Sequence, residues 1–181
     1  MNIANKLTLI RVALIPVFIA FFYLDTGYWN YYVAALIFIA AALTDLFDGA
    51  LARKRNIVTK FGKLIDPIAD KLLVCSALVL LAAAGRIHAV FVIVLIGREF
   101  IISGFRALAA AEGLVLAASN LGKLKTVVQI VMVVTVLLWH GVFGEWIVIF
   151  GIVLIWASVA LSVVSCADYF LKNKAIVKDM F

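Results

Sequence analysis

Apolar residues run along this chain in six long stretches that short polar segments separate. A helix needs about 20 consecutive apolar residues to cross the roughly 30 Å hydrocarbon core of a membrane. The pattern therefore predicts an all-α fold with six transmembrane helices, at 7–24, 30–52, 64–84, 87–111, 121–141 and 145–171. Because the connecting segments are short, neighbouring helices should run antiparallel. Pro16 should kink the first of them.

The composition agrees with a membrane protein. Of the 181 residues, 67% are hydrophobic and only 14% are charged, and the mean hydropathy is +1.20. An ordinary soluble domain has a much more even balance of polar and apolar residues. We therefore expect a single integral membrane domain over residues 1–181 and no separate soluble domain.

The basic residues predict how the helices are oriented, because cytoplasmic loops of membrane proteins are enriched in Lys and Arg. If the N-terminus is cytoplasmic, all of the 16 Lys and Arg residues except Arg86 fall on or toward the cytoplasmic side. The opposite side carries interfacial aromatic residues such as Trp29 and Trp146. Both termini should then be cytoplasmic. The net charge of +6 does not indicate nucleic-acid binding, because the basic residues are dispersed and form no recognisable nucleic-acid-binding module.

The segment TDLFDGALARKRNIVTKFGKLIDPIADK, residues 44–71, concentrates four of the ten acidic residues of the chain. They are Asp45, Asp48, Asp66 and Asp70. The first two end the second predicted helix and the other two begin the third, so the hairpin between these helices can bring both pairs together. Residues three or four positions apart share a helix face. Three small residues on the same faces leave room for a ligand: Gly49, Ala52 and Gly62.

Four neighbouring carboxylates repel one another unless a positive charge lies between them. Oxygen ligands without His or Cys favour a hard divalent ion, Mg²⁺ or Mn²⁺. Four aspartates could hold two such ions, which would bridge a substrate diphosphate, and Arg53 could bind phosphate beside them. The alternative is that the aspartates only pair with Lys and Arg at the wet edge of the membrane. Their helical register favours a functional site.

The pattern Asp45-x-x-Asp48-Gly49-x-x-Ala52-Arg53, then eight residues, then Gly62-x-x-x-Asp66-x-x-x-Asp70 resembles, without a gap or substitution, the signature of the CDP-alcohol phosphotransferases. The resemblance implies a six-helix membrane enzyme, usually a homodimer, with a binuclear metal centre at the cytoplasmic face. Such enzymes transfer a phosphoalcohol from a CDP-linked donor to a hydroxyl acceptor and release CMP. On the matching positions the four aspartates would bind metal, and Asp70 would also be the general base. The residues that would shape the CDP pocket are Asp48, Gly49, Ala52, Arg53 and Gly62.

Two arginines interrupt the fourth apolar stretch, within Gly97-Arg98-Glu99-Phe100 and Gly104-Phe105-Arg106. Because they are eight residues apart, Arg98 and Arg106 lie on nearly the same helix face. Lys123 and Lys125 follow at the start of the next helix, and the four cations could clamp a phosphate carried by the acceptor. Alternatively, the lysines only reflect the positive-inside bias, and Arg98 pairs only with a carboxylate such as Glu99. Arginines inside a membrane segment are costly, which favours a functional role for both.

Together with residues 2–11, these segments resemble the bacterial phosphatidylglycerophosphate synthases, a branch of the same family. Ala4 and Phe105 depart from the Pro and Leu expected there. In that branch Asn5, Thr8 and Arg11 would lie near the donor phosphates. The residues alone are equally explained by a polar helix start with an arginine that reaches toward water.

The resemblance implies an enzyme of the bacterial cytoplasmic membrane that transfers the phosphatidyl group of CDP-diacylglycerol to sn-glycerol 3-phosphate. The products would be phosphatidylglycerophosphate and CMP. Other acceptors stay open, namely inositol phosphate, serine, or phosphatidylglycerol as in a cardiolipin synthase. A divalent-cation transporter is a different class of protein, in which the aspartates would form a transport site. Such sites are expected near the membrane midplane on broken helices or repeats, whereas these aspartates lie at one face and no repeat is visible.

Overall fold

Six α-helices make up most of the chain that this computed structural model describes, residues 3–24, 27–55, 60–114, 119–139 and 144–174. Side chains are described within these ranges except at 3–8, 45–55, 60–67 and 70. The helices are α1 (Ile3–Tyr23), α2 (Trp29–Arg55), α3 (Lys60–Ala83), α4 (Ala89–Ala111), α5 (Asn120–Leu137) and α6 (Glu145–Lys172). The described ranges contain no strand. The predicted all-α class is confirmed, and each helix coincides with one predicted apolar stretch.

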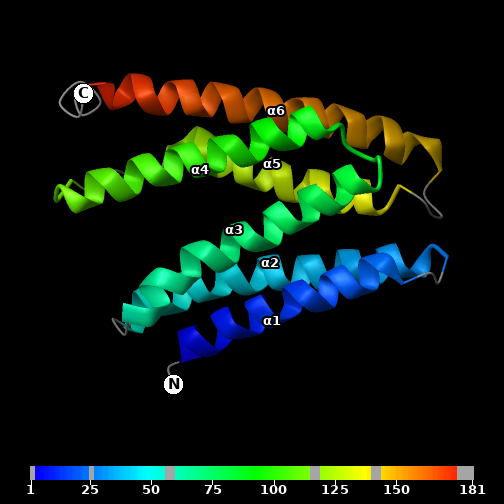
Figure 1. Ribbon diagram of the computed structural model, residues 1–181, viewed down its shortest axis with the longest axis horizontal. Coiled ribbons are helices and arrows are strands. Elements are labelled where there is room, and N and C mark those ends of the chain that lie inside the picture. The colour runs from blue at the N-terminus through cyan, green and yellow to red at the C-terminus, as the bar shows by residue number, and fades with distance from the viewer. Residues whose placement is uncertain (1–2, 25–26, 56–59, 115–118, 140–143, 175–181) are drawn as a thin grey trace.

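Consecutive helices run in opposite directions along the long axis of the molecule (Figure 1). One end gathers the starts of α1, α3 and α5 and the ends of α2, α4 and α6, and we call it the site end. The start of α1 and the end of α6 therefore lie at the same end. The antiparallel arrangement predicted from the short connections is confirmed. It places the segments that carry the acidic signature and the basic residues of α4 and α5 in one half of the molecule.

Buried apolar side chains from several helices form a shared core. Phe18 of α1 and Phe38 of α2 are fully buried, and their ring centroids lie 5.9 Å apart. Small residues line the contact between α5 and α6, where Ser158 and Ser162 are fully buried. Small side chains allow helix backbones to approach closely, which is a common way to pack helices within a membrane.

Arg86 joins the turn between α3 and α4 to two other helices at the end opposite the site. Only 7% of the residue is exposed. Its Nη1 donates hydrogen bonds to the carbonyl oxygens of Val136 and Leu137 at 3.1 Å each, and its guanidinium lies 3.8 Å from the centroid of the Tyr31 ring. The last carbonyls of a helix have no partner within the helix and carry partial negative charge. The one cation predicted on the far side thus has a structural role, because it caps α5.

Two helices are long and apolar enough to cross a membrane, α5 and α6. Their mean hydropathies are 1.5 and 2.8. On α6, large apolar side chains such as Ile149, Ile152 and Val153 are exposed. Shorter apolar segments occur in the first three helices, at Leu9–Tyr23, Trp29–Thr44 and Lys71–Ala83. A membrane location is therefore supported, while the count of six spans stays a prediction.

Candidate active site

The aspartates of the signature lie on two helices that pack together and meet at the site end (Figure 1). Asp45 and Asp48 belong to the second half of α2, and Asp66 and Asp70 to the first half of α3. The backbone of α3 stays helical through position 67, so positions 66 and 70 are one turn apart, as the sequence predicted. The side chains of the whole signature lie outside the described residues: Asp45, Asp48, Gly49, Ala52, Arg53, Gly62, Asp66 and Asp70. Their grouping around a metal stays a prediction.

Elsewhere among the described side chains, no three His, Cys, Asp or Glu residues come together in a way that could hold a metal ion. The polar residues at the start of the chain lie on the first turns of α1, which packs against α2 and α3. The side chains of Asn5 and Thr8 are outside the described residues. Arg11 is described, and only 1% of it is exposed. Its guanidinium is therefore enclosed by the bundle rather than extended into water.

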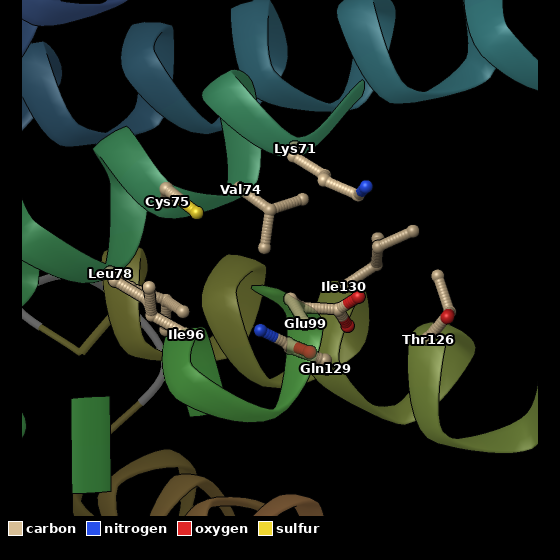
Figure 2. Close-up of a pocket in the computed structure, with 9 residues that line it drawn as sticks. All are labelled: Lys71, Val74, Cys75, Leu78, Ile96, Glu99, Thr126, Gln129 and Ile130. Carbon is tan, nitrogen blue, oxygen red and sulfur yellow. The ribbon is translucent and has the colours of Figure 1, made fainter. Parts of the chain in front are cut away.

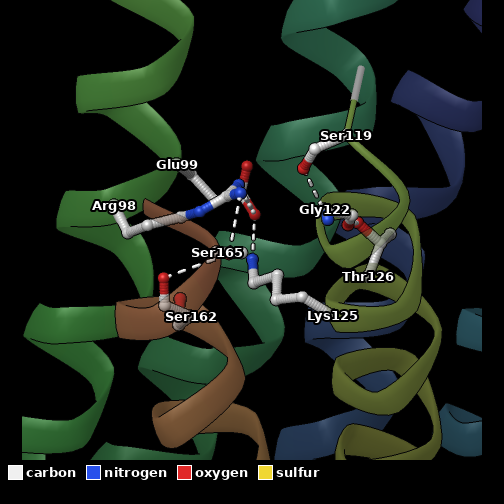
Figure 3. A network of polar contacts seen from close by, with 8 residues as sticks. All are labelled: Arg98, Glu99, Ser119, Gly122, Lys125, Thr126, Ser162 and Ser165. Atoms are coloured by element: carbon white, nitrogen blue, oxygen red, sulfur yellow. Dashed lines mark hydrogen bonds and ion pairs between the residues drawn. The ribbon is translucent and has the colours of Figure 1, made fainter. Parts of the chain in front are cut away.

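A polar network joins α4, α5 and α6 within the site half of the bundle (Figure 3). Lys125 of α5 is fully buried, and its ammonium group pairs with the Glu99 carboxylate of α4. Arg98 Nη1 lies 3.6 Å from the same carboxylate oxygen, and Arg98 Nη2 donates to Ser165 Oγ of α6 at 3.0 Å. Ser165 in turn donates to the Ser162 carbonyl at 3.1 Å. Glu99 therefore holds cations from two helices.

The first turn of α5 approaches this network closely. Ser119 caps the helix, because its Oγ accepts a hydrogen bond from the Gly122 amide at 3.0 Å. A β-carbon at position 122 would lie 3.2 Å from Ser119 Oγ and 3.6 Å from Arg98 Nη2. Glycine at this position thus leaves space where the Arg98 guanidinium meets the N-terminal turn of α5. The partial positive charge of a helix N-terminus adds to the charge of the arginine there.

We call Arg98, Arg106, Lys123 and Lys125 together the basic region, and the hydroxyl of Tyr169 lies beside it. Arg106 and Lys123 are both exposed. Tyr169 of α6 is 3% exposed, and both Arg98 and Arg106 lie within electrostatic range of its hydroxyl. The Tyr169 hydroxyl and Arg98 Nε are buried and have no hydrogen-bond partner among the described residues. The region therefore combines positive charge with unused donors, which is the chemistry that binds a phosphate.

A polar pocket lies between α3, α4 and α5, next to the Glu99 carboxylate (Figure 2). Its polar walls come from Lys71, Glu99, Thr126 and Gln129, and its apolar walls from residues such as Leu78. Lys71 directly follows Asp70 along α3. The pocket therefore reaches from the Glu99 pair toward the helix that carries half of the acidic signature.

The sequence predicted the cations of this region but missed several of their neighbours. The pair between Arg98 and Glu99, which the sequence offered as an alternative, is present. The contact of Glu99 with Lys125 and the contributions of Ser165, Tyr169 and Gln129 were not predicted. Gln129 is the only glutamine of the chain and stands within an apolar stretch, which was an available signal. Of the predicted acceptor residues, the network brings Arg98 and Lys125 to one carboxylate, while Arg106 and Lys123 lie on the exposed side.

Known proteins are similar to this chain in sequence over nearly its whole length. The sequence profile of the CDP-alcohol phosphatidyltransferase family matches residues 1–164. A relative from Bacillus subtilis, named CDP-diacylglycerol–glycerol-3-phosphate 3-phosphatidyltransferase, is 43% identical over 98% of this chain and 97% of its own length. Relatives of the same name are 41% identical in Shigella flexneri, over 98% of both chains, and 37% identical in Rickettsia typhi, over 93% of this chain and 95% of its own length. The chain belongs to the CDP-alcohol phosphatidyltransferase family.

Proposed function

We propose that the protein transfers the phosphatidyl group of CDP-diacylglycerol to sn-glycerol 3-phosphate, with phosphatidylglycerophosphate and CMP as products. The observation that carries the proposal is the similarity to relatives of that name along nearly the full length of both chains. The arrangement of the helices supports it, because the acidic signature and the basic region lie in the same half of the bundle. A two-substrate transfer needs such a pair of neighbouring subsites.

The donor would bind at the end of α2 and the start of α3. The carboxylates of Asp45, Asp48, Asp66 and Asp70 are a set of oxygen donors without His or Cys, which fits Mg²⁺ or Mn²⁺, and four carboxylates could hold two ions. When bound, the ions would neutralise negative charge on the donor diphosphate and on the departing CMP. The residues that would shape the nucleotide pocket around them are Gly49, Ala52, Arg53 and Gly62. Asn5, Thr8 and Arg11 of α1 would lie near the donor phosphates.

The acceptor phosphate would bind in the basic region. Arg98 and Arg106 would supply charged donors, and Lys123 would add charge at the exposed start of α5. Lys125 would act from its ion pair with Glu99. Tyr169 would add a donor that the sequence did not reveal, because its buried hydroxyl has no partner and lies close to both arginines.

Asp70 would be the general base. It would take the proton from the 1-hydroxyl of glycerol 3-phosphate, whose oxygen then attacks the phosphorus that carries the diacylglycerol. A new phosphorus–oxygen bond forms as the bond to CMP breaks, and CMP leaves with the electron pair. Placing the acceptor on the side opposite the nucleotide favours this in-line displacement.

The membrane arrangement we propose has six spans, both termini in the cytoplasm and the site end at the cytoplasmic face of the bacterial cytoplasmic membrane. The distribution of Lys and Arg supports this orientation. The acyl chains of the donor could then stay in the bilayer while its nucleotide enters the polar site. A homodimer is the expected assembly for this family.

One assay tests the proposal. Purified protein with Mg²⁺ and radiolabelled CDP-diacylglycerol is offered glycerol 3-phosphate, inositol phosphate, serine or phosphatidylglycerol in separate reactions. Phosphatidylglycerophosphate should form in the first reaction only. A labelled product with another acceptor would reassign the substrate. Uptake of divalent metal into liposomes without any lipid turnover would instead identify a transporter.

A further inference from the structure

The pocket beside Glu99 has no assigned occupant. It encloses about 50 Å³ of space that water-sized molecules can enter, bounded by α3, α4 and α5. Since one water needs about 10–15 Å³ on this measure, the pocket has room for roughly three to five waters. It is the right size for the hydroxyl-bearing end of a small polar molecule.

Gln129 shows that the pocket is built for a polar occupant. Only 2% of this residue is exposed, and its side-chain nitrogen is buried without a hydrogen-bond partner in the part of the chain that the structure describes. An unpaired buried amide group is costly, so proteins normally satisfy it with a protein group, a water or a ligand. Gln129 lines the pocket together with Glu99 (Figure 2). The residue that carries the unpaired amide therefore borders the space that a ligand can enter.

The position of the pocket relative to the basic region limits what the ligand can be. Lys125 precedes Gln129 by four residues on α5, so the two share a helix face one turn apart. Lys125 pairs with Glu99, and Glu99 lies 3.6 Å from Arg98. A small molecule whose phosphate contacts Arg98 could therefore place its next few atoms at Gln129. Lys71 lines the pocket from α3, and it directly follows Asp70 in the sequence.

We propose that this pocket binds the 2-hydroxyl of the acceptor and that Gln129 is a specificity-determining residue. The Gln129 amide hydrogen-bonds to the hydroxyl, which suits either end of the amide because a hydroxyl both donates and accepts. The Glu99 carboxylate, held in place by Lys125, accepts the second hydrogen bond. The inference rests on the proposed transfer to glycerol 3-phosphate. It explains how a site that binds phosphate through charge would also select a vicinal diol.

The test compares two acceptors that differ only at the 2-position, sn-glycerol 3-phosphate and 3-hydroxypropyl phosphate, which lacks that hydroxyl. Each is used with CDP-diacylglycerol and Mg²⁺, and the ratio of their kcat/KM values is measured. The parent protein should prefer glycerol 3-phosphate by about tenfold or more, because the analogue leaves buried polar groups unpaired. Gln129→Met keeps the length of the side chain but removes the amide. It should reduce the preference to within about threefold, mainly by raising KM for glycerol 3-phosphate.

Thr135→Val is the matched control on the same helix. Thr135 is also buried, but its hydroxyl donates to the Val131 carbonyl and it does not line the pocket. Its acceptor preference should equal that of the parent. An unchanged preference in Gln129→Met would overturn the inference. If that variant does not fold, a parent protein that uses both acceptors equally well overturns it without any variant. Absence of transfer to either acceptor would instead refute the proposed function.

Discussion

The net positive charge of the basic region depends on the Glu99 carboxylate. It carries one negative charge, while Arg98 and the fully buried Lys125 beside it carry two positive charges. Burying the lysine without a carboxylate would be strongly unfavourable. One carboxylate neutralises the lysine and leaves the arginine charge available. The cluster can therefore be stable in the bundle and still attract a phosphate.

The arginines of α4 should act on the acceptor. Changing either Arg98 or Arg106 to Ala should raise KM for glycerol 3-phosphate by about tenfold or more, because one charge-assisted contact to phosphate is lost. KM for CDP-diacylglycerol should change little. Steady-state kinetics with each substrate varied in turn measure both values. Lys172→Ala is the control, because Lys172 is exposed and pairs with Asp168 near the end of α6. A loss confined to donor affinity would assign the arginines to the other substrate.

Asp70 should be needed for proton transfer more than for binding. Asp70→Asn keeps the shape of the side chain and removes the proton acceptor, so turnover should fall by roughly 10²-fold or more. Binding of CDP-diacylglycerol, measured separately, should persist. Turnover within about tenfold of the parent at saturating substrates and metal would leave Asp70 as at most a replaceable metal ligand.

At the scale of single residues, the sequence predicted which residues belong to the site better than it predicted which residues they contact. Arg98 and Arg106 stood out because charges within apolar stretches are costly. The neighbouring Glu99 was named as a possible partner of Arg98 and lies beside it. The long-range partners could not be predicted, since Lys125 meets a residue 26 positions away and Arg98 also meets one 67 positions away. Such contacts depend on which faces of α4, α5 and α6 pack together. Tyr169 and Gln129 were missed for the same reason.

At the scale of helices the hydrophobic pattern was sufficient. The predicted stretches located all six described helices, because each apolar run is long and ends at polar residues. The largest differences are four residues each: α1 begins at Ile3 rather than at 7, α3 begins at Lys60 rather than at 64, and α5 ends at Leu137 rather than at 141. The first turn of α3 lies ahead of the apolar stretch and contains polar residues. Hydropathy alone does not predict that these residues are helical.

The contact between α5 and α6 depends on a glycine. A β-carbon at position 151 would lie 2.8 Å from Trp139 Cε2 and closer still to Nε1. Gly151→Ala should therefore force the indole to move and destabilise the protein by about 1–3 kcal/mol. At about 2–4 °C for each kcal/mol, the thermal midpoint in detergent should fall by several degrees. Gly104→Ala on α4 is the control, because nothing lies within 4 Å of its added carbon. Its midpoint should stay equal or rise. Equal midpoints for both variants would contradict the role of Gly151.

At the scale of the whole molecule, the up-and-down path of the chain assembles the site. Residues far apart in sequence reach the same end because the helices alternate in direction (Figure 1). The sequence predicted this gathering from the charge distribution. It could not predict the pocket beside Glu99, because a cavity depends on how the side chains of three helices fit together.

Divalent metal should stabilise the site end as well as support turnover. Removing it with excess EDTA should abolish transfer and lower the thermal midpoint, because a ligand that binds only the folded state stabilises that state. Adding Mg²⁺ or Mn²⁺ should restore both properties. Transfer and thermal unfolding are measured on the same preparation, with Ca²⁺-saturated EDTA as the control for the chelator itself. Full turnover in excess EDTA would contradict the proposed metal site.

The ion pair between Glu99 and Lys125 also bears on how the chain is made. Ribosomes complete α4 before α5, so the carboxylate is already present when the lysine emerges. The lysine belongs to the less apolar of the two membrane-span candidates, with a mean hydropathy of 1.5 against 2.8 for α6. A lysine in a nascent span opposes insertion, by about 3 kcal/mol at the centre of the span and by less near its start, where Lys125 lies. We expect the Glu99 carboxylate of α4 to pair with Lys125 and thereby keep α5 in the bilayer during synthesis. A reporter fused after α6 measures this. In Glu99→Leu chains, the reporter should lie on the wrong side of the membrane in a larger fraction of molecules than in the parent. Equal fractions of misplaced reporter would show that α5 inserts without the help of Glu99.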